Sequence, residues 1–143
     1  MEFIRRSSDY ALRSLTHMAA FPKGKVFEVN ATAEEVSVSP LFLHKIFQRL
    51  ARQGILASQR GVRGGFSLAR NASEISAREI IEIVQGPIVV NKCLHKNKRI
   101  KCNYIADCSL REPLKTLQDK FTGVLDKLTL RQLLHDNTDK KGG

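Results

Sequence analysis

Apolar residues recur along this chain at helical spacing in six stretches. The clearest is 40–53, where the positions i, i+3, i+4 and i+7 are filled by Leu43, Ile46, Phe47 and Leu50. Ser39 is a candidate N-cap for this helix, Pro40 suits its first position, and Gly54 provides a stop. The same reasoning predicts helices over about 8–21, 29–36, 77–85 and 110–128, and a short one after Thr129. Candidate caps for three of these are Ser7 or Ser8, Ser76, and a capping box formed by Ser109 and Glu112. Pro113 lies in the first turn of that last helix, so a loose or later start is the alternative there.

Two short apolar runs, 55–58 and 66–68, flank the glycine-rich sequence QRGVRGG, which predicts a β-hairpin. A helix followed by a hairpin, with a helix pair upstream, is the layout of a winged helix-turn-helix. The expected fold class is therefore mainly α with a small β-hairpin, followed by a long C-terminal helix. The chain divides into a winged helix-turn-helix DNA-binding domain (1–86), a cysteine loop (87–109), a dimerisation helix with a short terminal helix (110–134), and a polar tail expected to be disordered (135–143).

Basic residues dominate this helix and hairpin. Residues 39–70 carry six Lys or Arg and no Asp or Glu, in a chain of formal net charge +10. An outward basic face is often only solvated surface. The absence of acidic groups and the two arginines among the glycines of the hairpin favour DNA binding, with the helix in the major groove and the hairpin along the backbone or minor groove. The outward candidates are His44, Lys45, Gln48, Arg49, Arg52, Arg60 and Arg63.

A heptad-like stripe runs along the predicted helix 110–128. Its apolar members are spaced alternately by four and three residues: Leu110, Leu114, Leu117, Phe121, Val124 and Leu128. The stripe could pack on its own domain as ordinary core, or pair with the same helix of a second chain. DNA-binding helix-turn-helix modules usually act as dimers, which favours a homodimer with this stripe as its interface.

All three cysteines, Cys93, Cys102 and Cys108, lie in one short segment rich in Lys and Arg. Neighbouring positive charge lowers thiol pKa values, and clustered thiolates are stabilised by a cation. A metal centre or a redox-reactive cluster is therefore expected. Zinc would need a fourth ligand, for which His95 is the local candidate, although the spacings are wider than in structural zinc sites. An iron–sulfur cluster accepts longer loops. Free cysteines in a flexible loop, or a regulatory disulfide between Cys102 and Cys108, are the alternatives.

Several pieces of the sequence resemble one known family. They are SSDYALRSLTHMA, SPLFLHKIFQRLARQGIL and SQRGVRGGFSLAR, together with a three-cysteine loop before a long helix. These resemble the Rrf-type winged helix-turn-helix regulators, the IscR- and NsrR-like group, over about residues 1–134. The resemblance implies a homodimeric transcriptional regulator that binds a pseudo-palindromic operator in double-stranded DNA, with binding controlled by a [2Fe–2S] or [4Fe–4S] cluster.

The resemblance also implies roles for particular residues. The three cysteines would be the cluster ligands, and Asp9 of the partner subunit would complete them. Arg60 would enter the minor groove, and Leu41, His44 and Lys45 would occupy recognition positions. Together with the outward residues of the helix and hairpin, the candidate DNA contacts are Ser39, Leu41, His44, Lys45, Gln48, Arg49, Arg60 and Arg63.

Other function classes find little support in the sequence. There is no run of about eighteen apolar residues to span a membrane and no apolar core of a signal peptide near the N-terminus, so a cytoplasmic protein is expected. There is no phosphate-binding loop, no paired-carboxylate signature and no nucleophile–base motif, so an enzyme is not expected.

Overall fold

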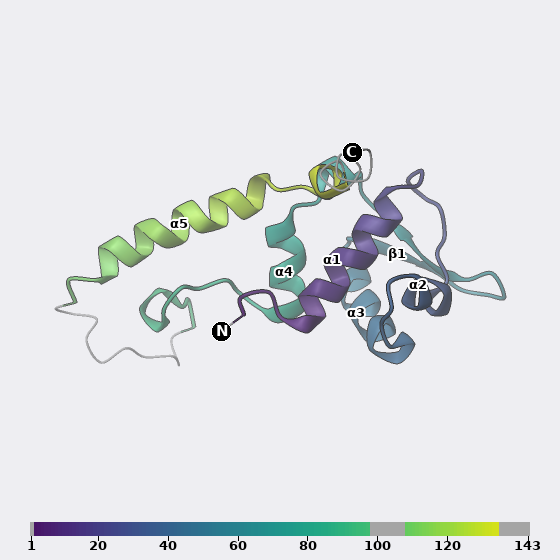
Figure 1. Ribbon diagram of the computed structural model, residues 1–143, viewed down its shortest axis with the longest axis horizontal. Coiled ribbons are helices and arrows are strands. Elements are labelled where there is room, and N and C mark those ends of the chain that lie inside the picture. Colours follow the sequence, from purple (N-terminus) through teal and green to yellow (C-terminus); the bar gives the residue numbers. More distant parts are fainter. Residues whose placement is uncertain (1, 98–107, 135–143) are drawn as a thin grey trace.

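The computed structural model of the protein describes residues 2–97 and 108–134. Within them the chain is mainly helical with one two-stranded hairpin (Figure 1). The elements, in chain order, are α1 (Arg6–Ala19), α2 (Val29–Glu35), α3 (Pro40–Arg52), β1 (Leu56–Gln59), β2 (Gly65–Leu68), the 3-10 turn η1 (Ala72–Glu74), α4 (Ala77–Gln85), the 3-10 turn η2 (Lys92–Leu94) and α5 (Arg111–Lys127). Residues 130–134 continue as a further helical turn.

The apolar stripe of α3 forms the centre of the core, as its periodicity predicts. Leu43, Phe47 and Leu50 are fully buried, and they pack with apolar residues of α1, the hairpin and α4. Burial of this kind contributes about 25 cal/mol for each Å² of apolar surface removed from water. Pro40 occupies the first turn of α3, and Gly54 follows the helix with a φ of +79°, so both predicted boundaries are confirmed.

The hairpin is held against the body of the molecule by a short third segment. β1 and β2 pair antiparallel from Leu56 opposite Leu68 to Gln59 opposite Gly65. Phe27 adds an isolated bridge to β2: its N–H donates to the Phe66 carbonyl at 2.7 Å, and its carbonyl accepts from the Phe66 N–H at 2.9 Å. A Cβ at Gly65 would lie 2.1 Å from the Phe27 carbonyl oxygen, so only glycine allows this pairing at its present distance.

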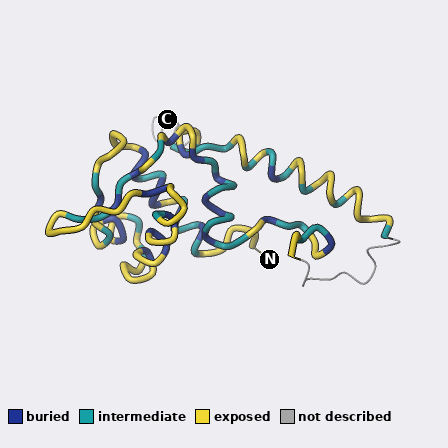
Figure 2. The backbone as a smooth tube through the Cα atoms, turned by 180° about the vertical axis from the view of Figure 1, so that it is seen from behind, coloured by how far each residue is buried: buried dark blue, intermediate teal, exposed yellow. Residues whose placement is uncertain are grey.

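α5 extends away from the body as an arm that is attached at its C-terminal end (Figures 1 and 2). The attachment includes two backbone hydrogen bonds, from Ala77 N–H to the Leu128 carbonyl at 2.7 Å and from the Leu130 N–H to the Ile75 carbonyl at 3.0 Å. Arg78 of α4 also pairs with Asp126 of α5 at 2.8 Å. The hydrogen bond to Asp126 raises the pKa of the Arg78 guanidinium above its ordinary value.

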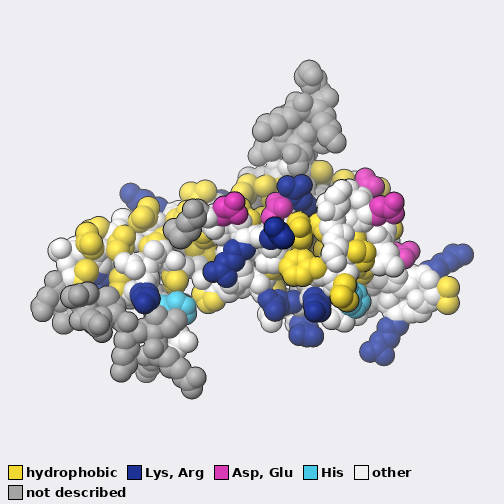
Figure 3. Space-filling view, turned by 60° about the horizontal axis from the view of Figure 1, so that its bottom comes forward, with side chains coloured by type: hydrophobic (Ala, Val, Ile, Leu, Met, Phe, Trp, Pro, Cys, Tyr) yellow, Lys and Arg dark blue, Asp and Glu magenta, His cyan; other side chains and the backbone are white. Residues whose placement is uncertain are grey.

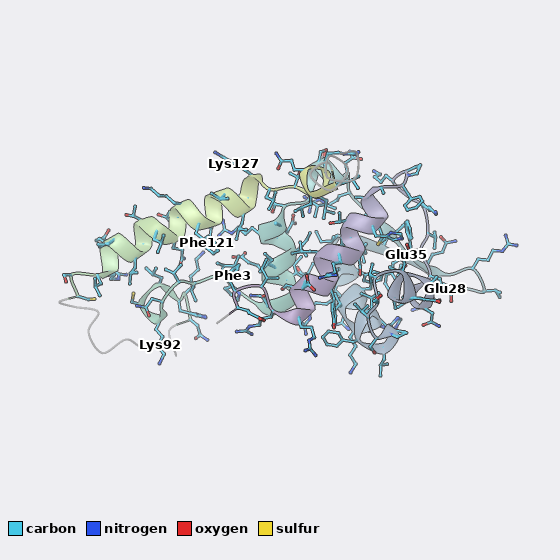
Figure 4. The ribbon with its side chains drawn as sticks, in the orientation of Figure 1. Phe3, Glu28, Glu35, Lys92, Phe121 and Lys127 are labelled. Atoms are coloured by element: carbon cyan, nitrogen blue, oxygen red, sulfur yellow. The ribbon has the colours of Figure 1, made fainter. Side chains whose placement is uncertain are left out.

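The N-terminal segment is fastened to the end of α4 by one side chain. The Gln85 Oε1 accepts from the Arg5 N–H at 3.1 Å and from the buried Ser8 hydroxyl at 2.6 Å, while its Nε2 donates to the Phe3 carbonyl at 3.0 Å. The Phe3 ring then meets the Phe121 ring of α5 edge to face, with centroids 4.9 Å apart (Figure 4). One glutamine thus joins the start of the chain to α4, and the segment it holds reaches α5.

Some of the predicted helix caps are wrong. Neither Ser7 nor Ser8 caps α1, because the helix begins one residue after Arg5 and the Ser8 hydroxyl turns inward to Gln85. Ser39 stands at the N-cap of α3, but its side chain makes no capping hydrogen bond. Ser76 does cap α4, accepting from the Glu79 N–H at 3.1 Å.

The capping box predicted for α5 does not form, and the helix begins one residue later, which is the alternative that Pro113 left open. The N-cap of α5 is Leu110, whose carbonyl accepts the first helical hydrogen bond from the Leu114 N–H at 2.9 Å. If the N-cap were Ser109, its carbonyl would have to accept the first helical hydrogen bond from residue 113, which is a proline and has no N–H. Shifting the start by one residue puts the proline where no N–H is needed.

Candidate functional site

An open groove of about 720 Å³ lies between the outward face of α3 and the hairpin, which we call the wing (residues 56–68). Its walls include His44, Gln48 and Arg52 of α3, and Arg60 and the glycines of the wing. The fold therefore brings two stretches of the basic sequence 39–70 to the same opening. A helix beside a glycine-rich hairpin is the arrangement that reads two neighbouring grooves of duplex DNA.

The polar face of α3 presents side chains to solvent. Leu41 is 70% exposed, and His44, Lys45 and Gln48 are exposed as well. The Nε2 atoms of His44 and Gln48 lie 3.1 Å apart, one helical turn from each other. The centroid of the His44 ring lies 6.0 Å from that of the Phe66 ring of the wing, so the two walls of the groove come together at these residues. Ser39, at the start of the helix, is also exposed.

Arg49 has a structural partner that its sequence position does not reveal. Its Nη1 donates to the Val84 carbonyl at 2.8 Å, at the C-terminal end of α4. The carbonyl end of a helix carries partial negative charge, which favours a guanidinium there. Arg49 thus ties α3 to α4, and its role as a DNA contact stays a prediction.

The wing tip, residues 60–64, carries two free cations. Arg60 and Arg63 are exposed, and neither forms an ion pair or side-chain hydrogen bond with another residue in the described ranges. The basic side chains at the narrow projecting end of the molecule are visible in Figure 3. Cations without acidic partners are available to phosphate groups.

The cysteine segment begins directly after α4 and ends at α5. Cys93 lies in η2 and is 8% exposed, whereas Cys108 is half-buried and lies two residues before Leu110, the N-cap of α5. Cys102 lies outside the described residues. The segment is tied to α5 by the Val90 N–H, which donates to the Gln118 Oε1 at 3.1 Å. In the described ranges no three His, Cys, Asp or Glu side chains come together as a metal-binding group.

The two further candidate ligands, His95 and Asp9, are bonded to different partners. The Nδ1 of His95 accepts from the Asn97 N–H at 3.2 Å. Asp9, on α1, is paired with Arg13 one turn later, at 3.0 and 3.1 Å, and its side chain remains 43% exposed. An exposed carboxylate held by one surface ion pair is accessible to another molecule, because such pairs are weak.

Three members of the apolar stripe on α5 face solvent. Leu110, Leu117 and Val124, which are seven residues apart, are 61%, 53% and 65% exposed. Leu114, Phe121 and Leu128 are half-buried. The stripe is therefore only partly covered within one chain (Figure 2).

The fold, with the groove between α3 and the wing, defines the class of this protein as a winged helix-turn-helix protein. A family model described as "Rrf2: Iron-dependent Transcriptional regulator" matches residues 4–136. The chain belongs to the Rrf2 family, which confirms the resemblance found in the sequence. Members of this family are transcriptional regulators and not enzymes.

Relatives and solved structures agree with this assignment. The chain is 30% identical to the HTH-type transcriptional regulator NsrR of Bacillus subtilis, covering 92% of this chain and 90% of that one. It is also 30% identical to protein aau3 of Rhizobium meliloti, covering 92% and 84%. The fold is similar to that of CymR of B. subtilis, with a TM-score of 0.75, 24% identity, and 94% and 98% of the two chains covered. It is likewise similar to T. potens IscR, with a TM-score of 0.70, 21% identity, and 95% and 88% covered.

Among the described residues no helix is long and apolar enough to cross a bilayer.

Proposed function

We propose that this chain is a homodimeric regulator whose affinity for a pseudo-palindromic operator depends on an iron–sulfur cluster held in the cysteine segment. The observation that carries the proposal is the position of that segment. The segment begins at the end of α4, where Arg49 of α3 donates to the Val84 carbonyl and the Gln85 side chain donates to the Phe3 carbonyl. It ends where α5 begins. A change of structure between α4 and α5 would therefore act on the recognition helix on one side and on the proposed dimer helix on the other.

In this proposal residues 1–86 bind the DNA. α3 enters the major groove and the wing lies in the adjacent minor groove, with base or phosphate contacts from the exposed side chains of α3 and the wing. In a dimer the two recognition helices meet half-sites about 34 Å apart, which is one turn of DNA.

The second copy is proposed to cover the stripe on α5. Its members Leu110, Leu117 and Val124 are each more than half exposed and lie along the same line of the helix. Exposed apolar residues at heptad spacing are buried when two such helices pack side by side. We therefore assign residues 110–134 to dimerisation.

The donor set fits an iron–sulfur cluster. Thiolates are the usual ligands of such clusters, and Cys93, Cys102 and Cys108 would supply three. The partner subunit's Asp9 would supply the fourth. When bound, the cluster would provide a redox-active centre. The burial of Cys93 would limit the contact of a bound cluster with water.

The test uses protein purified without oxygen. Its visible absorption, iron and acid-labile sulfide are measured, and its affinity for a duplex selected from a random-sequence pool is compared before and after removal of the iron by a chelator. A coloured protein containing sulfide, whose affinity changes when the iron is removed, supports the proposal. Cys102→Ala should abolish the colour, and a colourless wild-type protein without sulfide overturns the cluster while leaving DNA binding unaffected.

A second candidate is direct sensing of oxidants by the thiols. One specific similarity favours it: the chain is 26% identical to the solved structure of the oxidized form of CymR from Staphylococcus aureus, with a TM-score of 0.69 and 94% and 96% of the two chains covered. Here Cys102 and Cys108 would be joined by hydrogen peroxide, two thiols losing two electrons and two protons as the peroxide becomes two waters. Mass mapping after peroxide treatment detects the bond, and three free thiols would exclude it.

A further inference from the structure

Val62, at the apex of the wing, is the most exposed large apolar side chain among the described residues, with a relative exposure of 107%. A single exposed apolar residue is common on protein surfaces and needs no explanation by itself. Val62 differs in its neighbours, because Arg60 and Arg63 flank it and have no acidic partners in the described ranges. Val62 therefore stands at the exposed tip of the wing, between two cations that are available to the phosphates of a nucleic acid.

The backbone makes this tip both narrow and closed. Of the five residues 60–64, two are glycines, so only Arg60, Val62 and Arg63 carry side chains. Gly61 has a φ of +115°, and its carbonyl accepts from the Gly64 N–H at 2.9 Å. A Cβ at Gly64 would lie 2.4 Å from the Gln59 carbonyl oxygen, so the turn cannot take a bulkier residue there. The turn therefore holds Val62 at the front of a thin edge.

We propose that Val62 contacts the floor of the DNA minor groove and selects an A·T pair there by excluding guanine. This deepens the proposed function, because it rests on the wing lying in the minor groove. The minor groove is about 6 Å wide, which suits a thin tip whose foremost side chain is a short valine. Arg60, which is expected to enter the same groove, and Arg63 lie on either side of Val62 in the sequence and bring positive charge to the phosphates that border the groove.

The selection follows from what each base pair presents in that groove. A·T pairs show only acceptors, whereas G·C adds the N2 amine of guanine, a donor that projects from the floor. The methyl groups of valine cannot accept a hydrogen bond, so they would displace water from the amine and leave it without a partner. Against an A·T pair the same methyl groups bury no donor.

Inosine separates this effect from readout in the major groove. It pairs with cytosine as guanine does but lacks the N2 amine, so an I·C pair resembles G·C in the major groove and A·T in the minor groove. The probe is a duplex selected by the wild-type protein from a random-sequence pool, in which each A·T pair is replaced in turn by G·C and by I·C. At one pair per half-site, G·C should weaken binding about tenfold, within the usual cost of one wrong base pair, and I·C should bind like A·T.

Two variants test whether Val62 is the cause. Val62→Thr keeps the shape of the side chain and adds a hydroxyl that can accept from the amine, so the penalty for G·C should fall to less than about threefold. Val62→Ile remains apolar and should keep the full penalty. If Val62→Thr discriminates as strongly as wild type, or if I·C is penalised as strongly as G·C at every pair, the inference is wrong.

Arg60→Ala distinguishes that failure from failure of the wing assignment. If Arg60→Ala binds every duplex more weakly while Val62→Thr behaves like wild type, the wing contacts DNA and only the role of Val62 is wrong. If Arg60→Ala binds every duplex as well as wild type does, the wing is not in the groove, and both the wing assignment and the Val62 inference are overturned.

Discussion

Gln85→Leu should destabilise the protein by about 2–5 kcal/mol. The substitution removes three hydrogen bonds, to Phe3, Arg5 and Ser8. The two backbone partners, the Arg5 N–H and the Phe3 carbonyl, are at exposed positions and can form hydrogen bonds with water instead. The loss of each of these hydrogen bonds therefore costs about 0.5–1 kcal/mol. The Ser8 hydroxyl is fully buried and would lose its only acceptor, which costs about 1–3 kcal/mol.

The assay is urea unfolding at one fixed protein concentration, because the stability of a dimer depends on concentration. With a slope of about 2 kcal/mol per molar urea, a loss of about 3 kcal/mol lowers the midpoint by about 1.5 M. Gln53→Leu is the matched control. Gln53 is an exposed glutamine just after α3, with no side-chain hydrogen bond in the described part of the chain, so the same replacement there should change stability by less than about 0.5 kcal/mol.

A double-mutant cycle with Ser8→Ala identifies the responsible contact. Ser8→Ala in the Gln85→Leu background should cost little or even restore stability, because it removes the hydroxyl that has lost its acceptor. A Gln85→Leu protein as stable as the Gln53→Leu control would refute the reasoning. Strict additivity of Ser8→Ala and Gln85→Leu would show that the 2.6 Å hydrogen bond contributes nothing.

Other predictions test the groove, the arm and the hairpin. Arg60→Ala should weaken operator binding by about 1–3 kcal/mol in a titration at constant salt, and wild-type affinity would place the wing away from DNA. Leu117→Lys, which adds a charge to the exposed stripe of α5, should shift sedimentation towards monomer, whereas Thr116→Lys on another face of the helix should not; equal behaviour of the two would place the interface elsewhere. Gly65→Ala should lower the unfolding midpoint sharply, because the new Cβ meets a backbone carbonyl at 2.1 Å, while Gly123→Ala, with open space inside α5, should stabilise by about 0.5–1 kcal/mol.

The sequence predicted the elements of this fold well because local rules govern them. The stripe on α3 indicated both the helix and the face it buries, since apolar side chains at helical spacing have no other way to leave water together. The two runs around QRGVRGG predicted the hairpin, because a tight antiparallel turn needs residues that tolerate unusual backbone angles. The family followed from the same stretches, and the match over residues 4–136 confirms it.

Helix starts were predicted less well because a serine has more than one possible partner. Ser76 caps its helix, but the Ser8 hydroxyl is taken by Gln85, and the start of α5 moves past Ser109 because of Pro113. Only the second of these failures could have been found in the sequence, from the missing N–H of the proline. The first depends on a residue 77 positions away.

The tertiary structure alone decided how the parts are joined. Gln85 carries no periodic or motif signal, yet it fastens residues 3–8 to the end of α4. Arg49 looks in the sequence like one more outward cation of the recognition helix, but it is bonded to the carbonyl of Val84. Gly65 reads as a turn residue, whereas its need for glycine comes from the carbonyl of Phe27. Each of these contacts joins positions that are at least 35 residues apart along the chain. Local patterns record what a segment prefers, but a long-range contact depends on where the packing of the whole core brings two segments together.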